Sequence, residues 1–204
     1  MKTDQILQKY HIISDQVELT ELRVLLYQLE AQLRRGLSGN VVEFGCYVGT
    51  TSLFIRRLLD SYQFAGAFHA YDSFAGLPEK SVQDKSVVGE QFVAGELRAS
   101  RKTLLQNFKK AGLRPPIIHK GWFGEFAPAD IPDQIIFAFL DGDYYTSIKD
   151  SFAQITPKLA PRAVVVVDDY VSEALPGAAK ATNEWCHAHD LTPQVQASLA
   201  IIQT

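Results

Sequence analysis

The sequence predicts a doubly wound α/β fold with a mostly parallel sheet, and three observations support this prediction. Two uninterrupted apolar runs, at 135–140 and 164–167, are typical of strands that are buried on both faces. Helix-like segments of ten or more residues alternate with the strand-like runs, as they do in parallel sheets. A turn with two glycines, at 45–49, joins one such strand to the next helix, which is typical of a ligand-binding α/β domain.

The 204 residues are expected to form a single domain with one core, because this length is within the usual range. We divide it into an N-terminal helical region, 1–38, and an α/β core, 39–204. In the first part, leucines recur at helical spacing and predict an amphipathic helix over 14–35. Ser14 or Asp15 is expected to cap its start and Gly36 to end it. We expect this helix to be structural, covering the sheet or a partner subunit.

The remaining elements follow in alternation. Strands are expected at 40–44, 67–71, 116–119, 134–140 and 163–167, and helices at 51–61, 99–111, 144–159 and 177–189. The tail 192–204 is expected to add one or two terminal strands. The segment 75–96 is rich in glycine and has little periodicity, which predicts a long loop or lid.

Composition limits the classes of partner. The formal net charge of −3, the pI of about 5.9 and the absence of a basic run argue against nucleic acid or an anionic membrane as the main partner. No apolar stretch is long enough to span a bilayer, and the first nine residues do not resemble a signal peptide. We therefore expect a cytoplasmic protein in which Cys46 and Cys186 are reduced thiols.

Polar or glycine-containing segments follow each of the five predicted parallel strands. In open α/β sheets ligands bind at the carboxyl ends of the strands, so these segments are expected to form one site. They lie at 45–51, 72–73, 120–123, 141–143 and 168–170. The chain contains neither a Gly-x-Ser-x-Gly elbow nor a phosphate-binding P-loop, which disfavours hydrolase and NTPase functions.

The first of these segments has the spacing Glu-x-Gly-x-x-x-Gly, formed by Glu43, Gly45 and Gly49. Because Tyr47 occupies the central position, it is not the Gly-x-Gly-x-x-Gly of dinucleotide enzymes. Asp72 ends the next strand, where a carboxylate meets the hydroxyls of an adenosine ribose. The alternatives are a purely structural turn and an Asp72 that serves as a helix cap or loop anchor.

Two further segments contain candidate ligand-binding residues. Gly121 and Trp122 offer a flat aromatic wall for an adenine or an apolar ring, although a tryptophan that anchors a loop is an equal alternative. Asp141, Asp168 and Asp169 should place like charges together, and three such oxygen donors suit Mg²⁺ or a similar divalent ion. The alternative is helix capping by Asp143 and Asp169 without a metal, in which Asp143 would cap the helix from 144.

Together these motifs resemble a known family. The segment 43–51 is similar to the first motif of class I S-adenosylmethionine-dependent methyltransferases of the small-molecule, catechol-type branch. More closely, four ordered segments resemble the macrocin O-methyltransferase family, whose members methylate sugar hydroxyls of macrolides and related natural products. They are YDSFAGLP at 71–78, KGWF at 120–123, LDGDYY at 140–145 and VDDY at 167–170.

The resemblance implies a residue set for each ligand. Residues for the methionine part of the cofactor would be Glu43, Gly45, Tyr47, Gly49 and Thr51. Those for the ribose would be Asp72 and Ser73, and those bordering the adenine would be Gly121 and Trp122. The Mg²⁺ ligands would be Asp141, Asp168 and Asp169. Asp141 is the first choice as proton acceptor, ahead of Asp143 and His119.

The resemblance thus implies a Mg²⁺-dependent S-adenosylmethionine O-methyltransferase acting on a hydroxyl of a small molecule, such as a sugar diol in natural-product biosynthesis. Two departures matter: the region before Asn40 is short, which leaves the substrate and a homodimer open, and Tyr144 stands where catechol-type enzymes carry a lysine base. The rival functions are a nicotinamide oxidoreductase, because Asp72 would also serve NAD, and a cofactor-binding protein without turnover.

Overall fold

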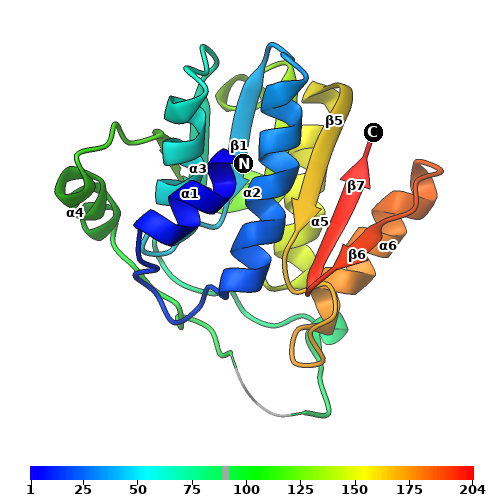
Figure 1. The fold of residues 1–204 in the computed structure, drawn as a ribbon. Helices are drawn as coiled ribbons and strands as arrows, with labels where there is room; N and C mark the ends of the chain where they lie inside the picture. The colour runs from blue at the N-terminus through cyan, green and yellow to red at the C-terminus, as the bar shows by residue number, and fades with distance from the viewer. Residues whose placement is uncertain (89–91) are drawn as a thin grey trace.

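The computed structural model describes residues 1–88 and 92–204. Their centre is a seven-stranded sheet with the order β3-β2-β1-β4-β5-β7-β6 (Figure 1). The five strands from β3 to β5 are parallel, and β7 runs antiparallel to β5 and to β6. The strands are β1 Asn40–Phe44, β2 Phe68–Asp72, β3 Ile117–Lys120, β4 Ile135–Leu140, β5 Leu159–Val167, β6 Gln194–Gln196 and β7 Leu199–Gln203.

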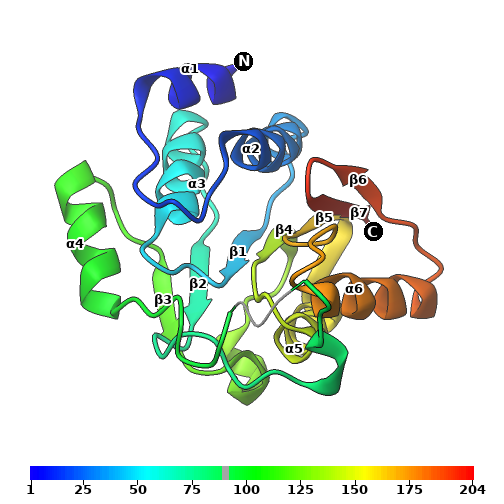
Figure 2. The same cartoon turned by 90° about the horizontal axis from the view of Figure 1, so that it is seen from below.

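Helices cover both faces of this sheet, as Figure 2 shows, with α1, α2 and α3 on one side and α5 and α6 on the other. They are α1 Lys2–Lys9, α2 Leu19–Arg34, α3 Thr50–Ser61, α4 Arg101–Ala111, α5 Tyr145–Ile155 and α6 Pro176–Ala188. Short 3₁₀ turns lie at Val82–Asp84, Phe123–Glu125, Pro128–Asp130 and Thr156–Lys158. The predicted doubly wound α/β class and the two extra terminal strands are confirmed.

Two apolar layers form the core. One lies between α2, α3 and the sheet, where Leu25, Leu26 and Leu29 are at most 1 % exposed. The other lies under α5 and α6, around Phe44 and Phe152. The strands β4 and β5 contribute side chains to both layers, which explains why their sequences are continuously apolar.

The N-terminal region differs from the prediction of one helix over 14–35. Ser14 does not cap a helix, because its hydroxyl accepts the N–H of Gln16 and closes a local turn. The helix α2 begins after Glu18 and ends at Arg34, and Gly36 follows with a left-handed φ of 67°. The preceding α1 was not predicted. The backbone N–H groups of Lys2 and Thr3, in its first turn, donate to the Glu30 carboxylate of α2.

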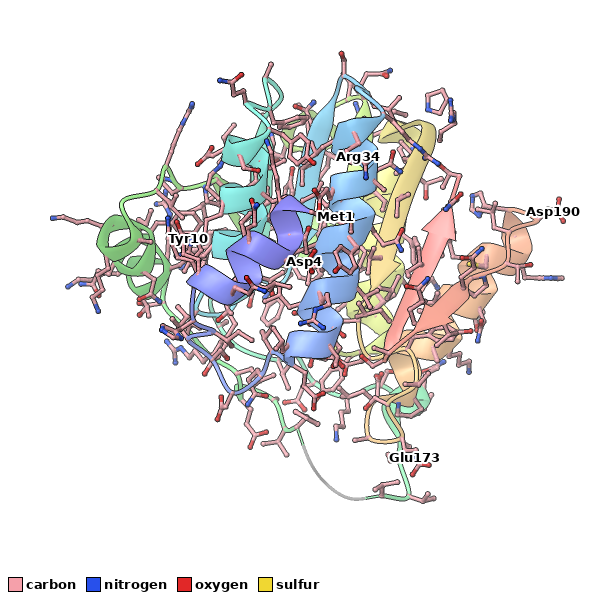
Figure 3. The ribbon with its side chains drawn as sticks, viewed as in Figure 1. Met1, Asp4, Tyr10, Arg34, Glu173 and Asp190 are labelled. Carbon is pink, nitrogen blue, oxygen red and sulfur yellow. The ribbon has the colours of Figure 1, made fainter. Side chains whose placement is uncertain are left out.

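Figure 3 shows Met1 and Asp4 lying over α2. The terminal ammonium of Met1 is 3.2 Å from the Asp4 carboxylate. The hydroxyl of Tyr27 in α2 donates to the other oxygen of the Asp4 carboxylate, and together with the bonds to Glu30 this contact fixes α1 against α2.

The end of α5 and the start of β5 also differ from their predicted positions, each for a physical reason. The helix α5 ends at Ile155 rather than at 159 and continues as the 3₁₀ turn Thr156–Lys158, because Pro157 has no N–H to donate to a carbonyl of the preceding turn. The strand β5 starts at Leu159 rather than at 163, and its pairing with β4 shifts register between Ile135 and Phe137. Arg162, at φ 68°, lies in this irregular part, which also accommodates Pro161.

Within residues 1–88 and 92–204, no helix is both long and apolar enough to cross a membrane. The expected long loop at 75–96 is confirmed on its described part, where the one helical element is the 3₁₀ turn Val82–Asp84. Residues 89–91 of that prediction lie outside the described residues.

Candidate active site

A cavity of about 340 Å³ opens at the carboxyl ends of the parallel strands. Its lining comes from all of the strand ends that the sequence analysis singled out. Of the predicted site residues it includes Gly45, Tyr47, Asp72, Ser73, Trp122, Asp141, Asp168 and Asp169. The loop after β2 crosses this edge of the sheet, at the bottom of Figure 1.

The turn after β1 depends on glycine for a steric reason. A Cβ at Gly45 would lie 1.8 Å from the carbonyl oxygen of Asp141, so only glycine permits β1 and β4 to approach this closely. Gly49, at φ 87°, is the N-cap residue of α3. Tyr47 adopts φ 45°, a left-handed conformation that is uncommon for a residue with a side chain. Gly45, Cys46 and Tyr47 of this turn line the cavity.

Asp72 holds this turn in place. One oxygen of its carboxylate accepts the N–H groups of Cys46 and Tyr47, at 2.9 and 3.1 Å, and the other accepts that of Phe74, at 2.6 Å. The alternative reading of Asp72 as a loop anchor is thus present in the structure. It coexists with a place in the cavity lining, which is where a ribose carboxylate would be required.

Glu43 lies beneath the turn and is fully buried. Ser52 donates to one of its carboxyl oxygens, and the other oxygen has no hydrogen-bond partner among the described residues. Burial raises the pKa of Glu43 to about 8, against a smaller lowering by Ser52. Glu43, Thr50 and Thr51 line a second hollow of about 30 Å³, which Gly45, Tyr47 and Asp141 share with the main cavity.

At the ends of β4 and β5, carboxylates form an acid cluster, defined here as Asp141, Asp143, Asp168 and Asp169. The oxygens of Asp141, Asp143 and Asp169 lie within 4.8 Å of one another. Asp168 lines the same cavity, and one of its oxygens accepts the N–H of Asp169 at 2.9 Å. The structure thus brings together a trio that differs from the predicted one, with Asp143 in place of Asp168.

Desolvation dominates the electrostatics of the acid cluster. Burial, reinforced by the neighbouring carboxylates, raises the pKa of Asp141 and of Asp168 well above the usual range. The same causes raise the pKa values of Asp143 and Asp169 to about 7. In the described residues the only hydrogen bond to any of these four side chains is the one from Asp169 to Asp168. A cation bound among these carboxylates would offset their mutual repulsion.

The alternative in which Asp143 caps the helix that follows is wrong. The N-cap position of α5 is Tyr144, and the N–H of Tyr145 donates to Asp84 at 2.7 Å. Asp84 comes from the loop after β2, 61 residues earlier in the chain. Asp143 itself adopts φ 59°, and its carboxylate joins the acid cluster instead.

Apolar side chains form another part of the cavity lining. Leu77, Phe92, Leu97 and Leu175 all line it, and they pack around the fully buried Tyr144. The hydroxyl of Tyr144 donates to the backbone carbonyl of Phe92, which holds the long loop onto the sheet edge. One cavity thus combines an apolar wall with a strongly acidic floor.

Sequence reasoning missed several lining residues. Gln16 and Glu21 enter the cavity from the connection before α2 and from its first turn, and Thr146, Ser147 and Asp150 enter it from α5. The spacing of 146, 147 and 150 places those three on one face of a helix, a signal that was available. The position of Glu21 depends on how α2 packs against β5, which no local pattern reveals.

Some predicted residues lie outside the main cavity. Gly49 and Gly121 line neither hollow, and Glu43 and Thr51 line only the smaller one. His119, the third choice as proton acceptor, is not part of the lining of either hollow. One of its ring nitrogens is 3.0 Å from a ring nitrogen of His69, and its ring stacks on Tyr71.

A family model described as "Macrocin-O-methyltransferase (TylF)" matches residues 8–199. The chain belongs to the macrocin-O-methyltransferase family. The family predicted from the motifs is thereby confirmed. A curated relative is the 8-demethyl-8-(2,3-dimethoxy-alpha-L-rhamnosyl)-tetracenomycin-C 4'-O-methyltransferase of Streptomyces olivaceus, 31% identical over 164 residues. The match covers 78% of this chain but only 63% of that relative, so the chain spans less than two thirds of its length.

Solved structures agree on the fold. The O-methyltransferase NovP has a TM-score of 0.77 at 23% identity, over 92% of this chain and 80% of that one. An O-methyltransferase from Bacillus cereus, solved in complex with SAH, has a TM-score of 0.57 at 14% identity, over 100% of this chain and 89% of that one. At these identities the similarity confirms the class I methyltransferase fold alone.

Proposed function

We propose that the protein is an S-adenosylmethionine-dependent O-methyltransferase that methylates a hydroxyl of a small molecule, a sugar or natural-product diol. The observation that carries this proposal is that the glycine turn, Asp72 and the acid cluster meet in one cavity. Family membership supports methyl transfer, and the named function of the Streptomyces relative, a 4'-O-methyltransferase of a rhamnosyl compound, supports a sugar hydroxyl.

For the cofactor, we propose the residue set predicted from the sequence. The methionine part would lie along Glu43, Gly45, Tyr47, Gly49 and Thr51, the ribose at Asp72 and Ser73, and the adenine at Gly121 and Trp122. The turn is suited to this role because its backbone is already held by Asp72. A preformed turn loses little conformational entropy on binding.

For the metal, the chemistry of the donors fits a hard divalent cation such as Mg²⁺, because the carboxylates of the acid cluster lie close together and have one hydrogen-bond donor between them among the described residues. We propose Asp141 and Asp169 as ligands, together with Asp168 as predicted or Asp143 as the geometry suggests. When bound, the cation would lower the pKa of a hydroxyl beside it and orient that hydroxyl toward the methyl donor.

The proton of the substrate hydroxyl that becomes methylated would pass to a carboxylate of the acid cluster. Asp141 is the predicted residue, and Asp143 is the alternative that lies in the same trio. A carboxylate whose oxygens ligate a cation is a poorer base than a free neighbour. Comparing Asp141→Asn with Asp143→Asn therefore separates the two roles: loss of metal affinity marks a ligand, and loss of turnover with metal affinity retained marks the proton acceptor.

The acceptor itself would be partly apolar. Leu77, Phe92, Leu97 and Leu175 offer it an apolar wall in the same cavity as the acid cluster. A hydroxyl-bearing ring attached to an apolar body would contact both the acid cluster and the apolar wall.

A homodimer and a cytoplasmic location remain predictions from the sequence.

The first test is calorimetry of S-adenosylmethionine and of NAD, each with and without EDTA. We expect S-adenosylmethionine to bind and NAD not to bind. Binding of NAD alone would replace the proposal with the oxidoreductase, and binding without turnover on any acceptor would leave a cofactor-binding protein.

The second test is a panel of hydroxylated metabolites with a labelled methyl donor, assayed with the wild type and with Asp168→Ala. If Asp168→Ala transfers methyl groups at the wild-type rate and with the same dependence on Mg²⁺, the assignment of this residue to the metal is incorrect.

A further inference from the structure

Asp150 is a half-buried carboxylate whose partner is missing from the described part of the chain. It lies on α5, lines the main cavity, and makes no hydrogen bond or ion pair with any described residue. Burial raises its pKa, and the charge of the adjacent Lys149 opposes this only in part. A carboxylate placed in this way is expected to bind a donor that a ligand supplies.

The residues around Asp150 leave space for its side chain. A Cβ at Gly124 would lie 2.7 Å from a carboxylate oxygen of Asp150, so a larger residue at 124 would displace the side chain. The amide of Gln154, one turn further along α5, donates to the backbone carbonyls of Phe123 and Phe126 at 3.0 and 3.1 Å. The loop after β3 and the helix α5 are thus fixed relative to each other.

Trp122 and Phe123 line the cavity beside Asp150, and Thr146 and Ser147 extend the same face of α5. The indole of Trp122 is 39 % exposed, so a flat surface remains open to a ligand. The glycine turn, Asp72 and Trp122 follow the neighbouring strands β1, β2 and β3, so Trp122 lies at the end of this row of strand ends. A nucleoside whose ribose lies at Asp72 would therefore place its base here.

On adenine, the 6-amino group is the only N–H donor of the base, because every ring nitrogen that is not bound to ribose is an acceptor. A carboxylate beside the adenine can consequently accept an N–H hydrogen bond from that group alone. We propose that Asp150 accepts a hydrogen bond from the 6-amino group of the cofactor's adenine and selects adenosyl over inosyl forms. This inference rests on the proposed function.

The test compares the binding of S-adenosylhomocysteine and of S-inosylhomocysteine, in which a carbonyl oxygen replaces the amino group and the N–H donor moves to N1. Calorimetry is performed on the wild type, on Asp150→Asn and on Asp190→Asn. Asp190 is an exposed aspartate beyond the end of α6, at the right edge of Figure 3, and it does not line the cavity. It controls for the loss of one surface charge.

We expect the wild type and Asp190→Asn to bind the adenosyl ligand at least about tenfold more tightly than the inosyl ligand. In Asp150→Asn the ratio should fall below about threefold, because an amide can accept from an amino group or donate to a carbonyl. Thermal unfolding checks that Asp150→Asn is folded. We expect it to fold, because asparagine has the same shape as aspartate and the side chain is only half-buried.

The outcomes separate the two proposals. If the adenosyl ligand binds and Asp150→Asn retains the wild-type ratio, or if the wild type shows no preference, the role of Asp150 is overturned and the proposed function stands. If the wild type binds neither ligand, the proposed function and this inference both fail.

Discussion

The glycine turn after β1 and the acid cluster after β4 and β5 occupy the same edge of the sheet but are stabilised in opposite ways. In the turn, the chain supplies the partners: Asp72 accepts three backbone N–H groups, and Asn107 of α4 donates to the carbonyl of Val48. In the acid cluster, one backbone N–H serves four carboxylates in the described residues. The protein itself holds the turn, whereas the carboxylates of the cluster are left with a single donor, which a bound cation would supplement.

This difference predicts which substitutions harm the fold and which harm only the chemistry. Removing a side chain from a saturated network leaves buried donors unpaired and costs stability. Removing a carboxylate from a crowded acidic group relieves repulsion and costs only the function that the charge served. Substitutions in the two regions therefore test the comparison, beginning with the largest expected effect.

Asp169→Asn should lower kcat/KM for methyl transfer by about 10³-fold, since charge stabilisation by a bound cation contributes several kcal/mol. The affinity for S-adenosylhomocysteine should change by less than about threefold, and the midpoint of thermal unfolding in EDTA should stay level or rise. Steady-state kinetics, calorimetry and melting curves measure these three quantities. A clear loss of stability without metal would show that the cluster is structural, contrary to the comparison.

Asp72→Ala should produce the opposite pattern. Three N–H groups of the turn would lose their acceptor, which should lower the free energy of unfolding by about 2–4 kcal/mol. Cofactor affinity should also fall by at least about tenfold, because the proposed ribose contact and the shape of the turn would be lost together. Denaturant unfolding and calorimetry provide the measurements. Asp72→Asn is the informative companion, because its single amide oxygen can accept fewer of the three donors.

The sequence predicted the first region better than the second because the turn is a local feature. Strand 40–44, the turn and the next helix follow from β-branched residues, two glycines and helical periodicity within about twenty positions. The acid cluster needed the relative positions of two strand ends. Periodicity placed Asp141 and Asp169 at the same edge, but it could not show that Asp143 turns inward at φ 59°.

Contacts between distant segments account for the other misses. Asp84 caps α5 across 61 residues, and Glu21 reaches the cavity from a helix that was expected to be structural only. Ser198, in the turn between β6 and β7, donates to the carboxylate of Glu21, 177 residues away. Such contacts depend on tertiary packing, and no spacing in the sequence encodes them.

Glu43 should make stability depend on pH. Its pKa in the folded protein, about 8, exceeds the ordinary value of 4.5, so the folded state retains a proton that the unfolded state has lost between these pH values. The free energy of unfolding should therefore decrease as pH rises from 4.5 to 8, by at most about 1.4 kcal/mol per pH unit from this group, and level off above 8.

The variant Glu43→Gln should lack this contribution, so its free energy of unfolding should approach and then exceed that of the wild type as pH rises. Urea unfolding between pH 5 and 9 measures the difference between the two proteins. Subtracting the two curves removes the same-signed contribution of the acid cluster, which both share. Parallel curves would mean that Glu43 is ionised in the folded protein and that an unseen partner compensates its charge.

Asn107→Ala should have the smallest effect. The substitution removes one neutral hydrogen bond of 2.9 Å, from the Asn107 amide to the carbonyl of Val48, which is expected to contribute about 1 kcal/mol. Alanine also has the higher helix propensity, by about 0.5 kcal/mol, and this gain partly hides the loss. Asn183→Ala on α6 carries the same gain and loses only an exposed bond from Tyr170, so it is the matched control.

The difference in the free energy of unfolding between these two variants isolates the tie between α4 and the turn. If the turn is held by the protein before any ligand arrives, Asn107→Ala should be less stable than Asn183→Ala by about 1 kcal/mol, and should bind S-adenosylhomocysteine a few-fold more weakly. Equal stabilities with unequal affinities would instead mean that the ligand organises the turn on binding, as a cation is expected to organise the acid cluster.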